Sequence, residues 1–158
     1  MLIIGDDGMD SLHYLLMRAH TCMQRRILSA AGELGLSPGQ PKVLEYLLAQ
    51  GESNQKAIAL GCEIEPATVG SILLRMERAG LICRAQHQGN RRSFWVSLTP
   101  QGRQLALRME EIFCQADEQA AENLSPQEIQ ALRQMLGQVC ENLACPPAEK
   151  EANHEAEA

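Results

Sequence analysis

The chain has 158 residues, of which 45% are hydrophobic and only 3% aromatic, so we expect one domain with appended helices and an aliphatic core. No run reaches the ~18 apolar residues of a transmembrane helix, and the first residues lack the basic segment of a signal peptide. We therefore expect a cytoplasmic protein that does not enter the membrane. The net charge of −6 argues weakly against nucleic-acid binding, but six arginines and one acid lie between Arg75 and Arg103.

The first predicted element is a long amphipathic helix. Residues 1–9 are expected to form an arm, and Asp10 or Ser11 can cap the helix that follows. Apolar residues then recur at helical spacing as far as Leu34, and Gly35 marks the end. One small domain cannot cover so long an apolar face, which indicates that it packs against a second subunit.

A second helix is predicted to begin just after the first. Ser37 can act as its cap, and Pro38 suits its first turn. Gly51 is expected to end it. Its apolar face comprises Val43, Leu44, Leu47 and Leu48.

The next stretch has the spacing of a helix-turn-helix. Ser53 or Asn54 caps a short helix, and Gly61 suits the tight turn after it. Pro66 begins the second helix at a position where proline is tolerated, and Gly80 ends it. The second helix of such a unit lies in the DNA major groove. The residues expected to contact DNA from this unit are Asn54, Gln55, Pro66, Ala67, Thr68, Gly70, Ser71 and Arg75.

A β-hairpin with a basic tip is predicted to follow. Residues 81–85 and 93–98 have strand character, and residues 86–92 form a polar turn. We expect a third strand of one or two residues near Ser53. The tip residues Asn90, Arg91 and Arg92 are expected to contact phosphates or the minor groove.

Two further helices complete the predicted order, which is α-α-α-α-β-β-α-α. Thr99–Gly102 caps the first of them, and the run Ser-Pro-Gln-Glu from Ser125 forms a capping box for the last. The Glu- and Ala-rich tail, residues 146–158, is predicted to be disordered. The predicted fold class is therefore mainly α with a small β-hairpin wing.

The order of the elements and two motifs resemble the MarR (multiple-antibiotic-resistance regulator) family over roughly residues 12–143. The first motif is Ala67-Thr68-Val69 followed by the segment 75–82. The second is the segment 90–102, which is similar to the family pattern of Asp-any-Arg, a strand, and Leu-Thr-any-any-Gly. Either motif alone is moderately specific, and the two together are specific.

The resemblance implies a winged helix-turn-helix homodimer whose first and last helices intertwine, on a pseudo-palindromic double-stranded DNA operator. Most members of the family are repressors that respond to small phenolic or lipophilic molecules, to oxidants or, in a few cases, to metals. We expect a repressor released by a small lipophilic or phenolic effector, and neither a cofactor nor a metal. The residues expected to line the effector pocket are Leu16, Met17, Met23, Val43 and Leu47. The implied division is an N-terminal arm and dimerisation helix (1–36), a DNA-binding lobe (37–102), C-terminal dimerisation helices (103–145) and an acidic tail (146–158).

Three departures from the family pattern affect operator preference. Asn90 replaces the wing aspartate, so the charge that orients a wing arginine is missing. Gly70-Ser71 stands where relatives often carry threonine and arginine, which removes a long base-reading side chain. Leu74 occupies a position where an acid is common.

Two alternatives remain open from the sequence: a winged-helix protein-interaction module without DNA binding, and a thiol-based redox-responsive regulator. The six cysteines show no metal-ligand spacing, and we interpret them as structural thiols, mostly buried. His13 and His20 can share a helix face, but zinc sites combine three or four ligands. No glycine-rich phosphate loop or nucleophile elbow is present, so an enzyme is not expected.

Overall fold

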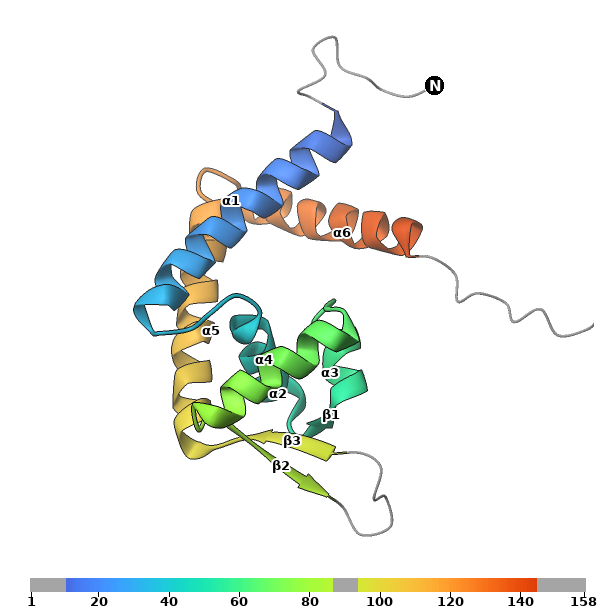
Figure 1. The fold of residues 1–158 in the computed structure, drawn as a ribbon. Coiled ribbons are helices and arrows are strands. Elements are labelled where there is room, and N and C mark those ends of the chain that lie inside the picture. Colours follow the sequence, from blue (N-terminus) through green and yellow to red (C-terminus); the bar gives the residue numbers. More distant parts are fainter. Residues whose placement is uncertain (1–10, 87–93, 145–158) are drawn as a thin grey trace, which may run out of the picture. The chain divides into compact units, whose positions relative to one another are not determined.

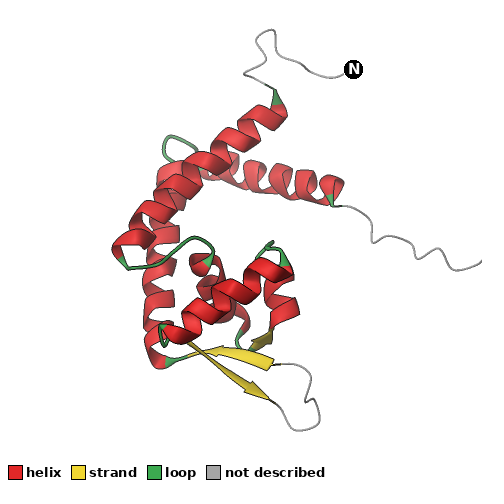
Figure 2. Cartoon of the chain, in the orientation of Figure 1, coloured by secondary structure: helices red, strands yellow, loops and turns green. Residues whose placement is uncertain are grey.

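The computed structural model describes residues 11–86 and 94–144, and the chain divides into two compact units, residues 1–120 and 121–158 (Figure 1). The expectations for Asn90, Arg91, Arg92, the N-terminal arm and the acidic tail lie outside the described residues. Helices dominate the described chain, as Figure 2 shows. The elements are α1 (Leu12–Glu33), α2 (Gln40–Gln50), β1 (Ser53–Asn54), α3 (Gln55–Gly61), α4 (Pro66–Arg78), β2 (Ile82–Gln86), β3 (Phe94–Leu98), α5 (Pro100–Ala120) and α6 (Pro126–Leu143).

The strands form one antiparallel sheet in the order β1-β3-β2, so the expected short third strand is confirmed. Val96 of β3 faces Ser53 on one side and Arg84 on the other. Val96 is also buried, and it joins the sheet to the helices through a single core. The largest buried side chains of this core are Leu44, Ile58, Ile72, Leu73, Met76, Met109, Val43 and Val69.

The predicted start of α2 is wrong by two residues, because the N-cap is Gly39 rather than Ser37. The Gln40 N–H donates to the Ser37 carbonyl (3.1 Å), and the Gln40 side chain accepts from the Ser37 N–H (2.8 Å). These bonds close a turn before the helix, in which Gly39 has a φ of 88°. Glycine tolerates this left-handed conformation, and Pro41 then serves as the proline of the first helical turn.

The turn between α3 and α4 uses a different residue from the one expected. Glu63 takes the positive φ (52°), whereas Gly61 is the last residue of α3. A Cβ at Gly61 would collide with the ring of Tyr46 on α2. Gly61 is therefore needed for packing between the helices rather than for the turn itself.

Hydrogen bonds at the start of α5 join this helix to the end of α4. The Thr99 hydroxyl donates to the Gly80 carbonyl (2.6 Å) and accepts from the Gly102 N–H (3.0 Å). A Cβ at Gly102 would collide with the carbonyl oxygen of Leu81. The Thr-Pro-Gln-Gly sequence thus acts both as a helix cap and as a close backbone junction.

In the second unit, α6 begins with the predicted capping box. The Ser125 N–H donates to the Glu128 carboxylate (2.8 Å), and the Glu128 N–H donates to the Ser125 hydroxyl (3.3 Å). This bonding lowers the pKa of Glu128. None of the residues of α6 is buried within the single chain.

Over residues 11–86 and 94–144, no single helix is long and apolar enough to cross a membrane. The bent pair of α3 and α4, at 110° to each other, meets the criterion only when the two are taken together.

Candidate nucleic-acid interface

The second helix of the helix-turn-helix, α4, has one buried and one exposed face. Because successive residues of an α-helix are about 100° apart, Val69, Ile72, Leu73 and Met76 share a face, and all four are buried. The opposite face carries exposed residues at spacings of four, three and four positions. They are Ala67, Ser71, Leu74 and Arg78.

The predicted contact residues occupy different parts of this helix. Ala67 and Ser71 lie in the exposed row, and Arg75 is exposed on its flank. Leu74 and Arg78 complete the exposed row but were not among the residues expected to contact DNA, although the helical spacing from Ala67 and Ser71 was a signal for both. Leu74 is 43% exposed.

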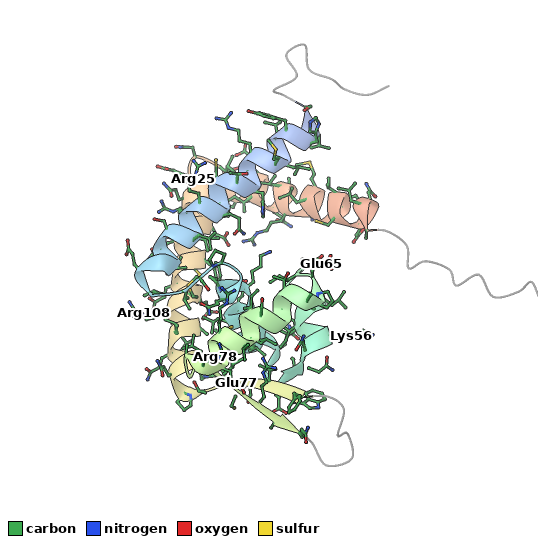
Figure 3. The ribbon with its side chains drawn as sticks, in the orientation of Figure 1. Arg25, Lys56, Glu65, Glu77, Arg78 and Arg108 are labelled. Atoms are coloured by element: carbon green, nitrogen blue, oxygen red, sulfur yellow. The ribbon has the colours of Figure 1, made fainter. Side chains whose placement is uncertain are left out.

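The arginines near α4 do not all remain available to a partner. Arg84 of β2 forms an ion pair with Glu77 (Nε to Oε2, 3.2 Å) at the end of α4. Arg75 and Arg78, in the last turn, are exposed (Figure 3 labels Arg78). Cations at this end also interact favourably with the helix dipole.

Asn54 and Gln55 hold the helix-turn-helix together. The Asn54 side chain accepts from the Ala57 N–H (2.9 Å) and so caps α3. The Gln55 amide donates to the Pro66 carbonyl in the first turn of α4 (3.4 Å). A Cβ at Gly70 would come within 3.2 Å of the same amide nitrogen, so Gly70 leaves space for this brace between the helices.

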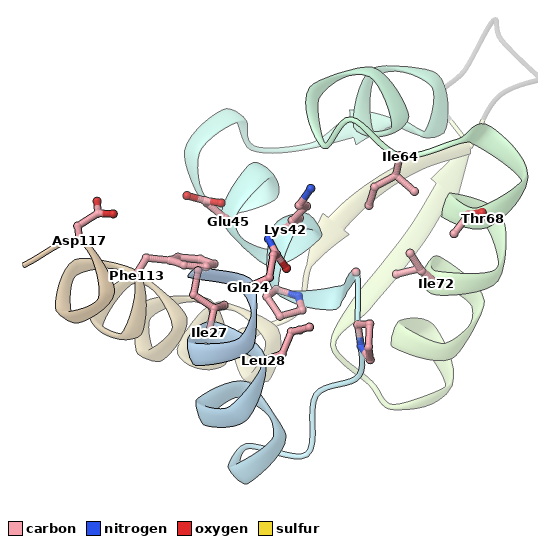
Figure 4. A pocket seen from close by; sticks show the side chains of 13 residues that line it. Gln24, Ile27, Leu28, Lys42, Glu45, Ile64, Thr68, Ile72, Phe113 and Asp117 are labelled. Carbon is pink, nitrogen blue, oxygen red and sulfur yellow. The ribbon is translucent and has the colours of Figure 1, made fainter. Parts of the chain in front are cut away.

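Thr68 lies on the flank of α4 that lines a cavity. Its carbonyl accepts a hydrogen bond from the Ser71 hydroxyl (2.8 Å), which occupies part of the hydrogen-bonding capacity of Ser71. The cavity has a volume of about 500 Å³, within the usual range for small-molecule sites. Its walls come from α1, α2, α4, α5 and adjoining turns, and consist of Gln24, Ile27, Leu28, Pro38, Gly39, Pro41, Lys42, Glu45, Ile64, Thr68, Ile72, Phe113 and Asp117 (Figure 4).

None of the five residues expected to line an effector pocket lines this cavity. Val43 and Leu47 are buried in the core, because they lie on the inner face of α2. Leu16, Met17 and Met23 precede the part of α1 that borders the cavity, which begins at Gln24. Methionines suit adaptable pockets, but the apolar part of this cavity wall is formed by branched aliphatic side chains, prolines and one aromatic ring.

The expectation of mostly buried cysteines is wrong for four of the five that the structure describes. Cys22, Cys83, Cys114 and Cys140 are exposed, because they lie on helix or strand faces that the single chain leaves uncovered. Cys62 is buried, its thiol contacts the Lys42 carbonyl (3.5 Å), and burial raises its pKa to about 11. Because the thiolate is the reactive form, Cys62 is a structural thiol.

Within residues 11–86 and 94–144, no group of three or more His, Cys, Asp and Glu side chains is arranged to hold a metal ion. His13 and His20 both lie on α1, without a third ligand from another described element.

Comparisons with known proteins agree with this architecture. The profile of the MarR family matches residues 36–94. An HTH-type transcriptional repressor of Mycobacterium tuberculosis is 26% identical over 133 residues, which is 84% of this chain and 94% of that protein.

Two solved structures extend the likeness to the three-dimensional fold. The transcriptional repressor CouR, bound to a 23-mer DNA duplex, superimposes with a TM-score of 0.77 and is 28% identical, covering 89% of this chain and 99% of CouR. BpsR of Bordetella bronchiseptica, whose DNA binding is regulated by 6-hydroxynicotinic acid, has a TM-score of 0.74 and is 26% identical, covering 81% of this chain and 97% of BpsR.

The helix-turn-helix and the three-stranded sheet agree with these comparisons, and the proteins compared are transcriptional regulators rather than enzymes. The chain is similar to the winged helix-turn-helix transcriptional regulators of the MarR family in its DNA-binding lobe and in its fold, and it is a DNA-binding transcriptional regulator.

Proposed function

We propose that the protein is a homodimeric repressor, released from a pseudo-palindromic operator when a small amphipathic molecule occupies the cavity. The observation that carries this proposal is that Thr68 and Ile72 of α4 line the same cavity as residues of α1 and α5. A ligand there contacts the recognition helix and the long helices together.

The dimer part of the proposal rests on uncovered apolar faces. On α1, Leu12 is 61% and Leu15 48% exposed. On α6, Ile129, Leu132, Leu136, Val139 and Leu143 recur at helical spacing, and none of them is buried. Apolar faces of this length are typical of surfaces that a second subunit covers.

Two-fold symmetry then predicts the form of the operator. One recognition helix from each subunit reads a half-site, so the half-site centres lie about 10 bp apart, one turn of the duplex. Ala67, Ser71 and Leu74 face the bases in this proposal, and Arg75 and Arg78 add contacts to phosphates. Arg91 and Arg92 remain expected phosphate or minor-groove contacts from the sequence alone.

Release follows from a population shift. A ligand favours the spacing of recognition helices to which it binds more tightly, and DNA favours the spacing that matches its groove repeat. If these two spacings differ, the ligand and the operator compete without sharing a site. A relative supports a small aromatic ligand, since 6-hydroxynicotinic acid regulates the DNA binding of BpsR.

The experiment measures the fluorescence anisotropy of labelled DNA from upstream of the gene, with a panel of aromatic acids and amines. We expect two subunits per duplex, loss of binding when either half-site is scrambled, and release by at least one class of compound. Leu28→Trp fills the cavity and should keep DNA binding while abolishing release. Binding of one subunit to one asymmetric half-site contradicts the dimer proposal, and undiminished release from Leu28→Trp contradicts the proposed effector site.

A further inference from the structure

We propose that the cavity selects organic cations, holding an ammonium group beside Glu45 and Asp117 and an apolar body against Phe113 and the aliphatic walls. This inference rests on the proposed function only in regarding the cavity as the effector site. The ligand then carries a charge opposite to that of 6-hydroxynicotinic acid, the carboxylic acid that regulates the DNA binding of BpsR.

The charge balance of the cavity is the first argument. Three of its lining residues are charged, namely Glu45, Asp117 and Lys42, so the walls carry one net negative charge. Figure 4 shows Glu45 and Asp117 at one end of the cavity and the α4 residues Thr68 and Ile72 at the other. A ligand that reaches from the acids to α4 therefore has its charged group at one end and its apolar group at the other.

Lys42 does not fully compensate for the acids. It precedes Glu45 by three residues on α2, and its charge lowers the pKa of that carboxyl group. Burial, and then the charge of Asp117, act in the opposite direction, and the pKa of Glu45 is raised overall. A cation beside these two carboxylates relieves the repulsion between them.

An anion would find few partners in the same cavity. The first turn of α2 borders it, and helix N-termini commonly bind anions through backbone N–H groups. Here the Gln40 N–H donates to Ser37 (3.1 Å), the Val43 N–H donates to Gly39 (3.4 Å), and Pro41 has no N–H. The backbone N–H and the ammonium group of Lys42 remain, but an anion bound to them also experiences the charge of the two carboxylates.

The apolar walls favour an organic cation over a metal ion. Phe113 lies one helical turn before Asp117 on α5, so its ring can face an ammonium group held by that carboxylate. Ile27, Leu28 and Ile64 supply aliphatic surface. No cluster of three metal-ligating side chains occurs among the described residues, so two carboxylates beside a ring suit a large, weakly hydrated cation.

The test compares three naphthyl probes of similar shape: 1-naphthylmethyl-trimethylammonium, 1-naphthaleneethanol and 1-naphthylacetate. Isothermal titration calorimetry of the full-length protein should give a Kd for the cation at least tenfold lower than for the alcohol, with the acetate weakest. Glu45→Gln combined with Asp117→Asn should remove the advantage of the cation over the alcohol. Lys42→Ala should tighten cation binding severalfold, and Phe113→Leu should weaken it.

Glu118→Gln is the matched control, because it removes one charge from the same helix at a residue that does not line the cavity. It should leave the Kd of all three probes unchanged. Acetate binding as tight as that of the cation, lost in Lys42→Ala, overturns the inference, and so does an absence of binding by all three probes at millimolar concentration.

Operator release, measured separately by anisotropy, distinguishes this inference from the proposed function. A cation that binds in a manner dependent on Glu45 and Asp117 but leaves the operator occupied supports the charge preference and refutes the effector role. An anion that releases DNA and requires Lys42 has the opposite meaning: the effector role stands and the charge preference fails.

Discussion

Helices α4 and α6 are built from similar sequence signals but reach different degrees of burial. Each begins with a proline in its first turn, and each carries apolar residues at helical spacing. On α4 the four residues of the inner face are 0–2% exposed, whereas Leu132 and Leu136 of α6 are 42% and 40% exposed. An amphipathic pattern thus shows that a face needs a cover, but not whether the same chain supplies it.

The largest expected effect comes from breaking the face of α6. Leu132→Glu with Leu136→Glu should raise the Kd of the dimer at least a thousandfold, about 4 kcal/mol, because it places unpaired charges in an apolar interface. Operator affinity should fall with it, as measured by sedimentation and anisotropy. Gln130→Glu with Gln134→Glu adds the same charge on the opposite face and should leave the dimer intact. If the variant with both leucines replaced remains dimeric, α6 is not part of the dimer interface.

Breaking the face of α4 should act on folding rather than on assembly. Met76 is fully buried, so Met76→Ala should lower the free energy of unfolding by about 2–5 kcal/mol through lost contacts and a residual cavity. Urea denaturation monitored by circular dichroism measures the loss. The subunits that remain folded should still dimerise, and a dissociated but fully stable Met76→Ala protein would contradict the contrast between the two helices.

The exposed face of α4 can be tested through Leu74. If Leu74 contacts a thymine methyl group, Leu74→Ala should cost about 1 kcal/mol of operator affinity, and replacing that thymine with uracil should cost about the same. The two changes together should then cost no more than either one alone. Arg78→Ala is the comparison variant, because loss of a phosphate contact weakens binding to all sequences and makes the salt dependence shallower. Fully additive costs for Leu74→Ala and uracil would show that this side chain does not contact the base.

The smallest expected effect concerns the glycine within α4. Gly70→Ala should stabilise the lobe by about 0.5–1 kcal/mol, because glycine has a low helix propensity. Outside its own helix, and among the described residues, the one near neighbour of the new methyl group is the flexible end of Gln55. Thermal unfolding measures the change, and Gln55→Ala serves as a background in which no side chain obstructs the new methyl group. If Gly70→Ala lowers the melting temperature when Gln55 is present but not in the Gln55→Ala background, the bond between Gln55 and Pro66 contributes more to stability than helix propensity at position 70 does.

Several site residues have roles that no local pattern predicts. Gln55 was expected to contact DNA, but its amide reaches the Pro66 carbonyl, 11 positions along the chain. From the sequence alone, Gly70 is a residue that weakens its helix, but in the structure its lack of a side chain leaves space for the Gln55 amide. Leu74 and Arg78 follow the exposed spacing of Ala67 and Ser71, so their place on the exposed face could have been predicted from the sequence.

The sequence by itself determined the order of the elements, the capping box of α6, the start of α4 and the family, because these depend on hydrogen bonds and periodicities that span three or four residues. Only the tertiary structure decided the need for Gly61 beside Tyr46 and the exposure of four cysteines. It alone assembled a cavity from residues between Gln24 and Asp117. These features arise where distant segments pack together, and the space left between helices depends on every side chain around it.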